Sequence, residues 1–238
     1  MQNDMNISVI VPTLNEAALI QPCLQHLRER AANAEIIIAD GGSSDGTAEL
    51  AMGLCDRIVH SKPGRATQMN TGARAARGEI LWFLHVDVTI PMECLDEIET
   101  IMDSQRVAGG FFRIRLPRSQ VVYRLTDGFA HYAGLLLRMR CGDHGIFCRR
   151  TAFTELGGFP EVPLMEDVEF FRRLRRRGPV RHSCKRIVVS PRRYEAIGPA
   201  RLTFAYGLIA TLYLFGTSLP TLATMYQRTC GDARDCNV

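Results

Sequence analysis

The first third of the chain alternates short apolar runs with segments of helical periodicity. Four apolar runs predict buried strands: residues 7–11, ended by Pro12, and residues 35–39, 57–60 and 79–84. Apolar side chains at helical spacing predict three helices between them: residues 16–30, 47–54 and 67–77, the last closed by Gly78. Strands that are apolar on both faces and separated by helices are typical of a parallel sheet covered on both sides.

The pattern changes after residue 90, although helices and strands continue to alternate. Helices are predicted at residues 93–102 and 165–177, strands at 109–116, 145–149 and 186–190, and a mixed amphipathic stretch at 121–140. We therefore expect an α/β domain over residues 1–200, with a mostly parallel sheet flanked by helices. An apolar helical segment at 201–228 and a polar tail at 229–238 would follow it.

Residues 202–226 carry no charge, and a run of this length could span a bilayer, which needs about 20 apolar residues. Threonines, glycines and Pro220 dilute it, so a helical hairpin that is buried or lies on a membrane surface is favoured over a span. The arginines upstream, within residues 172–201, could face anionic lipid. A solvated basic surface explains them equally well.

The composition is that of a globular protein without a structural metal site. The chain has 238 residues, 46% of them hydrophobic, and a net charge of +4, which favours one sizeable globular domain. No signal-peptide pattern opens the sequence, so a cytosolic start is expected. The eight cysteines form no CxxC pair, which predicts free thiols and no structural metal site.

The candidate binding and catalytic residues are sought in the loops that follow the strands, because ligands of open parallel sheets bind outside the carboxyl ends of the strands. The loop DGGSSDGT, residues 40–47, lacks the Lys-Ser/Thr ending of a P-loop, and no GxGxxG follows the first strand. Both absences argue against a P-loop and against a dinucleotide-binding site. Asp40 could accept hydrogen bonds from a pyrimidine imide or from ribose hydroxyls, and the glycines would let a flat base approach. Ser44 or Asp45 could simply cap the next helix.

Two further loops carry carboxylates. In HVDV, Asp87 could join a divalent cation to a diphosphate, or it could be a cap. In MEDVE, Glu166 and Asp167 could supply a general base, or they could complement the dipole of the helix that they begin. In SPRRYE, Arg192 and Arg193 could clamp a diphosphate or be surface charges.

Taken in order, PTLNE, DGGSSDGT, GRATQMNTGARAARGEILWFLHVD, GDHGIF and GGFPEVPLMEDVEFFRRL resemble the family-2 inverting glycosyltransferases of the GT-A fold, over residues 6–195. GRATQMN, FLHVD and GGFPEVPLMEDVE are most similar to a bacterial subgroup described as arsenosugar-biosynthesis-associated glycosyltransferases. The resemblance implies transfer of a sugar from a nucleotide diphosphate sugar, with a UDP-sugar expected, to a hydroxyl of a small molecule or lipid. Mn²⁺ or Mg²⁺ would be the cofactor. A cytoplasmic location is expected, at the inner face of the membrane if the acceptor is a lipid.

The resemblance also implies roles for single residues. Those implied to bind the nucleotide sugar are Pro12, Thr13, Glu16, Asp40, Arg65 and Asn70. Asp87 would be the metal ligand of the family's DxD motif, with His85 in place of the first aspartate. Asp167 would be the catalytic base, preceded by Glu166. Asp143 and His144 would face the acceptor, although a histidine satisfied within the core is the alternative for His144.

Three other functions stay open. A sugar nucleotidyltransferase would carry a Gly-rich loop with Arg or Lys after the first strand, and PTLNE has none. The incomplete DxD motif favours a non-catalytic binder of nucleotide sugars, whereas MEDVE argues against one. A nucleic-acid binder is suggested only by the arginine cluster, which lacks interleaved aromatic residues.

Overall fold

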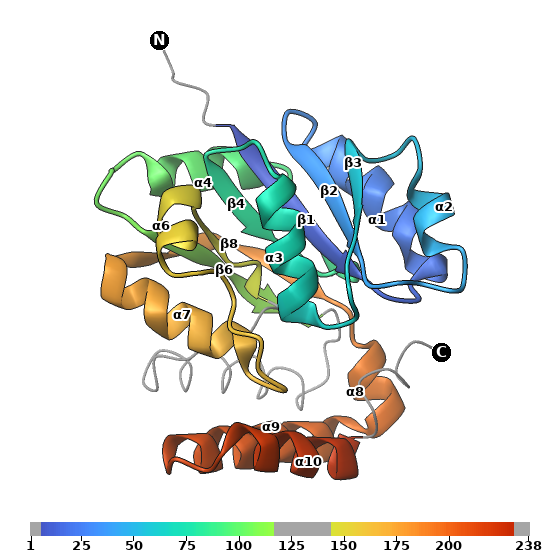
Figure 1. Ribbon diagram of the computed structural model, residues 1–238, viewed down its shortest axis with the longest axis vertical. Helices are drawn as coiled ribbons and strands as arrows, with labels where there is room; N and C mark the ends of the chain where they lie inside the picture. The colour runs from blue at the N-terminus through green and yellow to red at the C-terminus, as the bar shows by residue number, and fades with distance from the viewer. Residues whose placement is uncertain (1–5, 117–143, 231–238) are drawn as a thin grey trace.

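The computed structural model describes residues 6–116 and 144–230, which form an α/β structure around one eight-stranded sheet (Figure 1). The strand order is β3-β2-β1-β4-β7-β6-β8-β5. The strands are β1 Ile7–Thr13, β2 Glu35–Asp40, β3 Arg57–His60, β4 Ile80–Phe83, β5 Val88–Thr89, β6 Gly109–Arg115, β7 Phe147–Arg149 and β8 Val180–Val189. Neighbouring strands are parallel except where β7 pairs with β4 and β6, and where β5 pairs with β8. The predicted mostly parallel sheet is confirmed.

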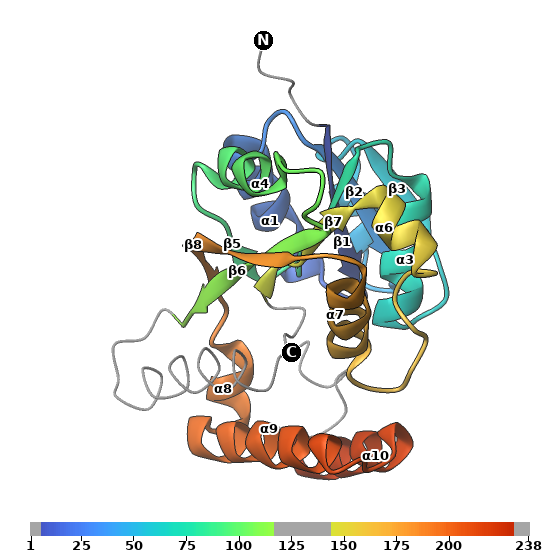
Figure 2. The same cartoon turned by 90° about the vertical axis from the view of Figure 1, so that its left-hand side faces the viewer.

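Helices cover both faces of the sheet: in Figure 2, α1 and α4 lie on one side of β1, and α3 and α6 lie on the other. The helices are α1 Ala17–Arg30, α2 Thr47–Ala51, α3 Arg65–Ala75, α4 Cys94–Met102, α6 Arg150–Glu155, α7 Glu166–Arg177, α8 Arg192–Ile197, α9 Pro199–Leu214 and α10 Leu219–Cys230. Val9 and Val11 of β1 pack with α1 and α4, whereas Ile10 packs with α3, α6 and α7. Successive side chains of a strand point to opposite faces, so β1 contributes to two hydrophobic cores at once.

Pro12 does not end the first strand, contrary to the prediction, because β1 continues to Thr13. Ile10 lies on the β4 side of β1, since its carbonyl accepts a hydrogen bond from the Leu84 N–H at 3.0 Å. Pro12, two residues later, faces the same side, where the pairing with β4 has already stopped at Phe83. The missing N–H of Pro12 therefore costs no hydrogen bond of the sheet.

Other boundaries differ because tertiary contacts set them. Helix α3 ends at Ala75, and Gly78 does not take the left-handed conformation expected of a helix-ending glycine. Gly78 is required by close approach instead, since a Cβ there would lie 2.6 Å from the Ser8 nitrogen. Strand β8 begins at Val180, earlier than predicted, because the edge of β6 supplies a parallel partner. The amphipathic stretch 121–140 lies outside the described residues.

The uncharged C-terminal segment forms a helical hairpin, α9 and α10, as predicted. Its buried residues pack with Leu164 and Met165, which precede α7. Tyr213 of α9 also contacts α7: its hydroxyl accepts a hydrogen bond from Arg172 at 2.7 Å and donates one to Glu169. None of the described helices is long and apolar enough to cross a membrane.

The cysteines of the described ranges are free thiols, which confirms that prediction for this part of the chain. Burial raises the pKa of Cys23 to about 12 and that of Cys94 to about 11. These two thiols therefore stay protonated and act as small apolar core residues. Cys184 is the exposed one among them.

Candidate functional site

The carboxyl ends of β1, β2 and β4 meet at one edge of the sheet, and the loops that follow them form the candidate site. The first two loops are joined by hydrogen bonds. Asn15, in a left-handed conformation with φ of 55°, donates its N–H to the Ser43 hydroxyl and accepts the Ser44 N–H with its side chain, both at 2.9 Å. Asp45 accepts the Ala17 N–H at 2.9 Å. PTLNE and DGGSSDGT are therefore one rigid unit.

Asp40 is buried beneath the DGGSSDGT loop and holds its backbone by hydrogen bonds. Its side chain is 2% exposed, and Oδ2 accepts the N–H groups of Gly42 and Ser43, each at 3.0 Å. Oδ1 accepts the Ser43 hydroxyl at 2.5 Å. Sequence reasoning missed this turn-capping role, for which Gly42 supplies the left-handed φ of 89°. A carboxylate has about four acceptor positions, so Oδ1 keeps one for a ligand.

Gln68 is a residue of the site that sequence reasoning did not select. Its Nε2 donates to the Thr13 carbonyl at 2.6 Å and to the Ala39 carbonyl at 3.0 Å, so it joins the ends of β1 and β2. A polar side chain on the inward face of a predicted helix was the available signal. The nearby Thr13 hydroxyl is buried and has no hydrogen-bond partner among the described residues. A buried hydroxyl of this kind favours a ligand-binding role for Thr13.

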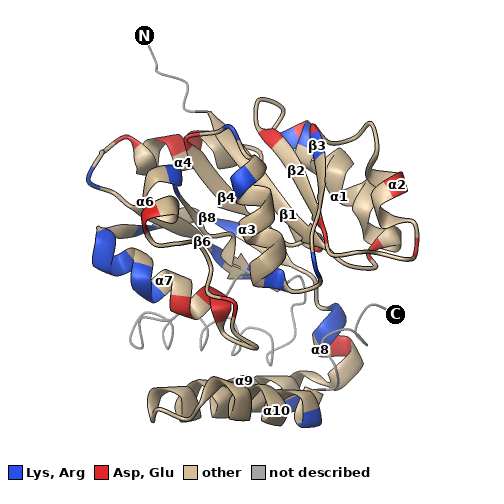
Figure 3. Cartoon of the chain, viewed as in Figure 1, with Lys and Arg blue, Asp and Glu red and all other residues tan. Residues whose placement is uncertain are grey.

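Glu166 and Asp167 begin α7, and both are buried. Glu166 Oε1 lies 2.8 Å from Nε of Arg65, the first residue of α3. This ion pair joins α3 to α7. The acids at the start of α7 and the arginines at its end also complement the helix dipole (Figure 3). Glu166 thus has a partner on α3, whereas Asp167 Oδ1 accepts the adjacent Val168 N–H at 2.7 Å.

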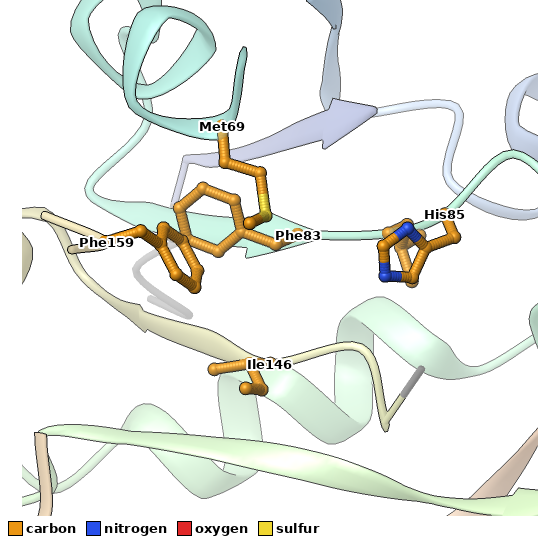
Figure 4. Close-up of a pocket in the computed structure, with 6 residues that line it drawn as sticks. Met69, Phe83, His85, Ile146 and Phe159 are labelled. Carbon is orange, nitrogen blue, oxygen red and sulfur yellow. The ribbon is translucent and has the colours of Figure 1, made fainter. Parts of the chain in front are cut away.

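Asn70 binds protein backbone. Its Nδ2 donates to the Phe159 carbonyl at 2.9 Å, and its Oδ1 accepts the Phe159 N–H at 2.8 Å. The side chain therefore ties α3 to the GGFP turn before α7. A small cavity lies beside this contact, between Met69, Phe83, His85, Ile146 and Phe159 (Figure 4). Its volume of about 10 Å³ is too small for a sugar.

We expect Asn70→Ala to lower the free energy of unfolding by about 2 kcal/mol or more, because it leaves two buried backbone groups of Phe159 unpaired. Asn33→Ala is the control, since Asn33 is exposed and its loss should change stability by less than about 0.5 kcal/mol. Urea unfolding of the two variants makes the comparison. Equal stabilities would contradict a structural role for Asn70.

Carboxylates from two other loops lie close to the guanidinium of Arg192. Its Nη1 lies 3.5 Å from Glu16 Oε2, and its Nη2 lies 3.9 Å from Asp87 Oδ2. Burial raises the pKa of Glu16 above its ordinary value, and the Arg192 charge opposes that rise. The neighbouring Arg193 lies elsewhere, 5.5 Å from the ring of Tyr226 in α10. The structure thus brings Glu16, Asp87 and Arg192 together and separates Arg193 from them.

The donor set at Asp87 fits a divalent cation. The described residues contain no group of three or more His, Cys, Asp or Glu placed to hold a metal. However, the carboxylates of Glu16 and Asp87 approach one guanidinium, which shows that a positive charge is accommodated between them. Mg²⁺ and Mn²⁺ prefer carboxylate oxygens and take further ligands from water and substrate phosphates.

Of the two residues expected to face the acceptor, His144 is described and Asp143 lies outside the described residues. His144 is buried, and its ring lies edge-on to Phe111 with centroids 6.1 Å apart. Gly145, which follows with φ of 56°, accepts a hydrogen bond through its carbonyl from Trp82 Nε1 at 3.2 Å. The core thereby fixes the loop that carries His144.

The chain is similar in sequence to proteins named as glycosyltransferases. The chain is 30% identical over 164 residues to a PGL/p-HBAD biosynthesis glycosyltransferase of Mycobacterium bovis (strain BCG / Pasteur 1173P2), an alignment that covers 64% of this chain and 62% of that protein. It therefore spans less than two thirds of that relative's length.

Among solved structures, it is similar to the mannosyltransferase PcManGT from Pyrobaculum calidifontis in complex with GDP-Man and Mn²⁺. That match has a TM-score of 0.66 and 21% identity, and covers 95% of this chain and 71% of the other. S. aureus TarS 1-349 in complex with UDP-GlcNAc gives a TM-score of 0.60 and 18% identity, over 84% of this chain and 65% of that one. These likenesses confirm the GT-A fold. Residues 8–154 match the sequence family described as "Glycosyl transferase family 2", and the chain belongs to that family.

Proposed function

We propose that this protein is an inverting glycosyltransferase that moves a sugar from a nucleoside diphosphate sugar, a UDP-sugar in the first instance, to a hydroxyl acceptor. The observation that carries the proposal is that three ion pairs join separate segments of the chain beside one end of the sheet. Arg65 with Glu166 links α3 to α7, and Arg192 links Glu16 to Asp87. Such an end is where open α/β sheets bind ligands.

The nucleoside would bind over the joined PTLNE and DGGSSDGT loops. Pro12, Thr13 and Asp40 lie at the ends of β1 and β2, and the spare hydroxyl of Thr13 and acceptor position of Asp40 suit a base or ribose. Arg65 would stand beside the nucleotide from α3. Asn70 would act through the backbone of Phe159, since its amide is already engaged there.

The diphosphate would meet Arg192 at the Asp87 loop, and Glu16, which pairs with Arg192, would line the nucleoside pocket. Asp87 would hold Mn²⁺ or Mg²⁺, and such an ion, when bound, neutralises charge that develops on the leaving diphosphate. Arg193 would contribute positive charge from the hairpin side. His144, with Asp143, would face the acceptor.

In the transfer step, Asp167 would take the proton from the acceptor hydroxyl while the oxygen of that hydroxyl forms a bond to the anomeric carbon. The bond from that carbon to the diphosphate oxygen breaks on the opposite face, so the anomeric configuration inverts. Glu166, held by Arg65, would position this end of α7. A carboxylate suits this role because, when ionised, it accepts hydrogen bonds and can accept a proton.

The finer assignments belong to the same proposal. A role in arsenosugar or related glycoconjugate synthesis rests on the resemblance of GRATQMN, FLHVD and GGFPEVPLMEDVE to that subgroup. Residues 1–200 would form the transferase domain, with the hairpin as an accessory segment. Phe204 and Phe215, 70% and 85% exposed on the hairpin, support a lipid acceptor and contact with the inner face of the membrane.

The test is release of nucleoside diphosphate from a panel of UDP- and GDP-sugars, with hydroxyl acceptors and with Mn²⁺, Mg²⁺ or chelator. We expect metal-stimulated release from one donor, reduced more than about tenfold in Asp87→Asn. Asp103→Asn removes an equal charge away from the sheet edge and should leave release unchanged. Donor binding without release under every condition would favour a binding protein, and pyrophosphate release from a nucleoside triphosphate and a sugar phosphate would favour a nucleotidyltransferase.

A further inference from the structure

One guanidinium faces two carboxylates at the candidate donor site. Side-chain exposures of 28% for Arg192, 14% for Glu16 and 19% for Asp87 show that the group is largely shielded from water. Together the three side chains carry one excess negative charge when ionised, in a place where a diphosphate would bring more. In the described part of the chain, Arg192 Nε is buried and has no hydrogen-bond partner. The guanidinium therefore does not use all of its N–H donors within the ion pair.

The sheet fixes Arg192 next to Asp87. Strand β5 directly follows Asp87 and pairs with the end of β8, where Val88 lies opposite Val189. The Ser190 N–H donates to the Asp87 carbonyl at 3.2 Å, and the Ser190 hydroxyl accepts the Arg192 N–H at 3.2 Å. Since hydrogen bonds to their backbone groups hold both residues, the fold places Arg192 close enough to Asp87 for the side chains to pair.

Arg192 and a divalent cation have the same preferred partner in Asp87. A guanidinium also binds phosphate oxygens through two parallel hydrogen bonds, so a diphosphate competes with Asp87 and Glu16 for Arg192. When a diphosphate engages Arg192, the guanidinium no longer competes with a cation for the carboxylate of Asp87. Conversely, a cation at Asp87 leaves Arg192 available to the diphosphate. Either ligand must break the ion pair in order to bind, and once one has done so the other binds more tightly. The two binding events are therefore positively coupled.

We propose that Arg192 is an exchangeable counter-ion that couples metal binding to diphosphate binding, by pairing with Asp87 and Glu16 in the free protein and with the diphosphate in the complex. This inference rests on the proposed function, because it requires that the site take a nucleoside diphosphate. It gives Arg192 a role that a simple phosphate clamp lacks: in the free protein, Arg192 weakens metal binding.

The experiment measures the affinities of Mn²⁺ alone, UDP alone and each in the presence of the other, by calorimetry, with GDP in parallel. In Arg192→Gln, Mn²⁺ alone should bind several-fold more tightly, and UDP alone should bind about tenfold more weakly. The coupling factor between the two ligands should fall by about fivefold or more. Arg192→Lys keeps the charge but not the planar fork, so it should hold Mn²⁺ affinity near that of the parent and recover part of the UDP affinity.

Arg186→Gln is the matched control, since Arg186 is an exposed residue of β8 and its loss removes the same charge. It should leave the coupling factor unchanged. Thermal unfolding of all variants checks that they fold. The inference is overturned if Arg192→Gln binds Mn²⁺ no more tightly than the parent, or keeps the parental coupling factor. Failure of the parent protein to bind UDP or GDP at all, with Mn²⁺ present, would instead overturn the proposed function.

Discussion

Asp167→Asn is expected to lower the rate constant of sugar transfer by about 10²- to 10⁴-fold, the usual contribution of a general base. Asparagine has nearly the same shape but cannot take the acceptor proton. The donor KM should change little, because the nucleotide would be held by other loops. Asp167 is buried in the first turn of α7, so the substitution alters one proton-accepting group at a fixed place.

Two further variants separate Asp167 from its neighbours. Glu166→Gln breaks the ion pair with Arg65 and should reduce transfer less than Asp167→Asn, since Glu166 is expected to position the helix. Glu161→Gln removes an exposed acid before the same helix and should leave the rate unchanged. The measurement is the initial rate of nucleoside diphosphate release at saturating donor and acceptor. If Glu166→Gln is the more severe variant, the base has been assigned to the wrong residue.

Trp82→Ala is expected to destabilise the protein by about 3–5 kcal/mol, as deletion of a fully buried aromatic side chain leaves a large cavity. Trp82 is 0% exposed, its ring centroid lies 5.4 Å from that of Phe112, and its Nε1 donates to the Gly145 carbonyl. A chain of this size loses about 2–4 °C of melting temperature per kcal/mol, so Tm should fall by about 6–20 °C.

Trp82→Phe separates packing from hydrogen bonding. It keeps most of the aromatic contact but leaves the Gly145 carbonyl without its donor, so its cost should be smaller than that of Trp82→Ala. Met92→Ala is the control, because Met92 is 57% exposed and should change stability by less than about 0.5 kcal/mol. Urea unfolding gives all three values. A loss below about 1 kcal/mol for Trp82→Ala would show that this core is not as well packed as the structure indicates.

Much of the fold could be predicted because its signals are local. The β3 range matched at both ends, and α1 and α7 matched within one residue, since apolar periodicity records which face of an element is buried. Pro12 and Gly78 were interpreted wrongly for the opposite reason. Pro12 is tolerated because a neighbouring strand has already ended, and Gly78 is needed because another strand approaches, and neither fact is visible in the local sequence.

The candidate site divides in the same way. Short sequence patterns made Asp40, Asp87, Glu166 and Asp167 candidates, because each follows a buried strand or begins a predicted helix, and the family resemblance then implied their roles. They could not reveal that Asp40 caps its own loop or that Asn70 is engaged by Phe159. Gln68 was overlooked because its position on the inward face of a predicted helix is only a weak signal until the carbonyls that it joins are known.

By itself, then, the sequence determined the alternation of strands and helices, the parallel pairing of the first four strands and the loops that carry chemistry. The tertiary structure alone decided that Arg192 meets Glu16 and Asp87, and that Arg65 meets Glu166. The physical reason is range. Periodicity and capping depend on residues within a few positions of one another, whereas an ion pair between distant loops depends on strand order, register and the packing of every element between them.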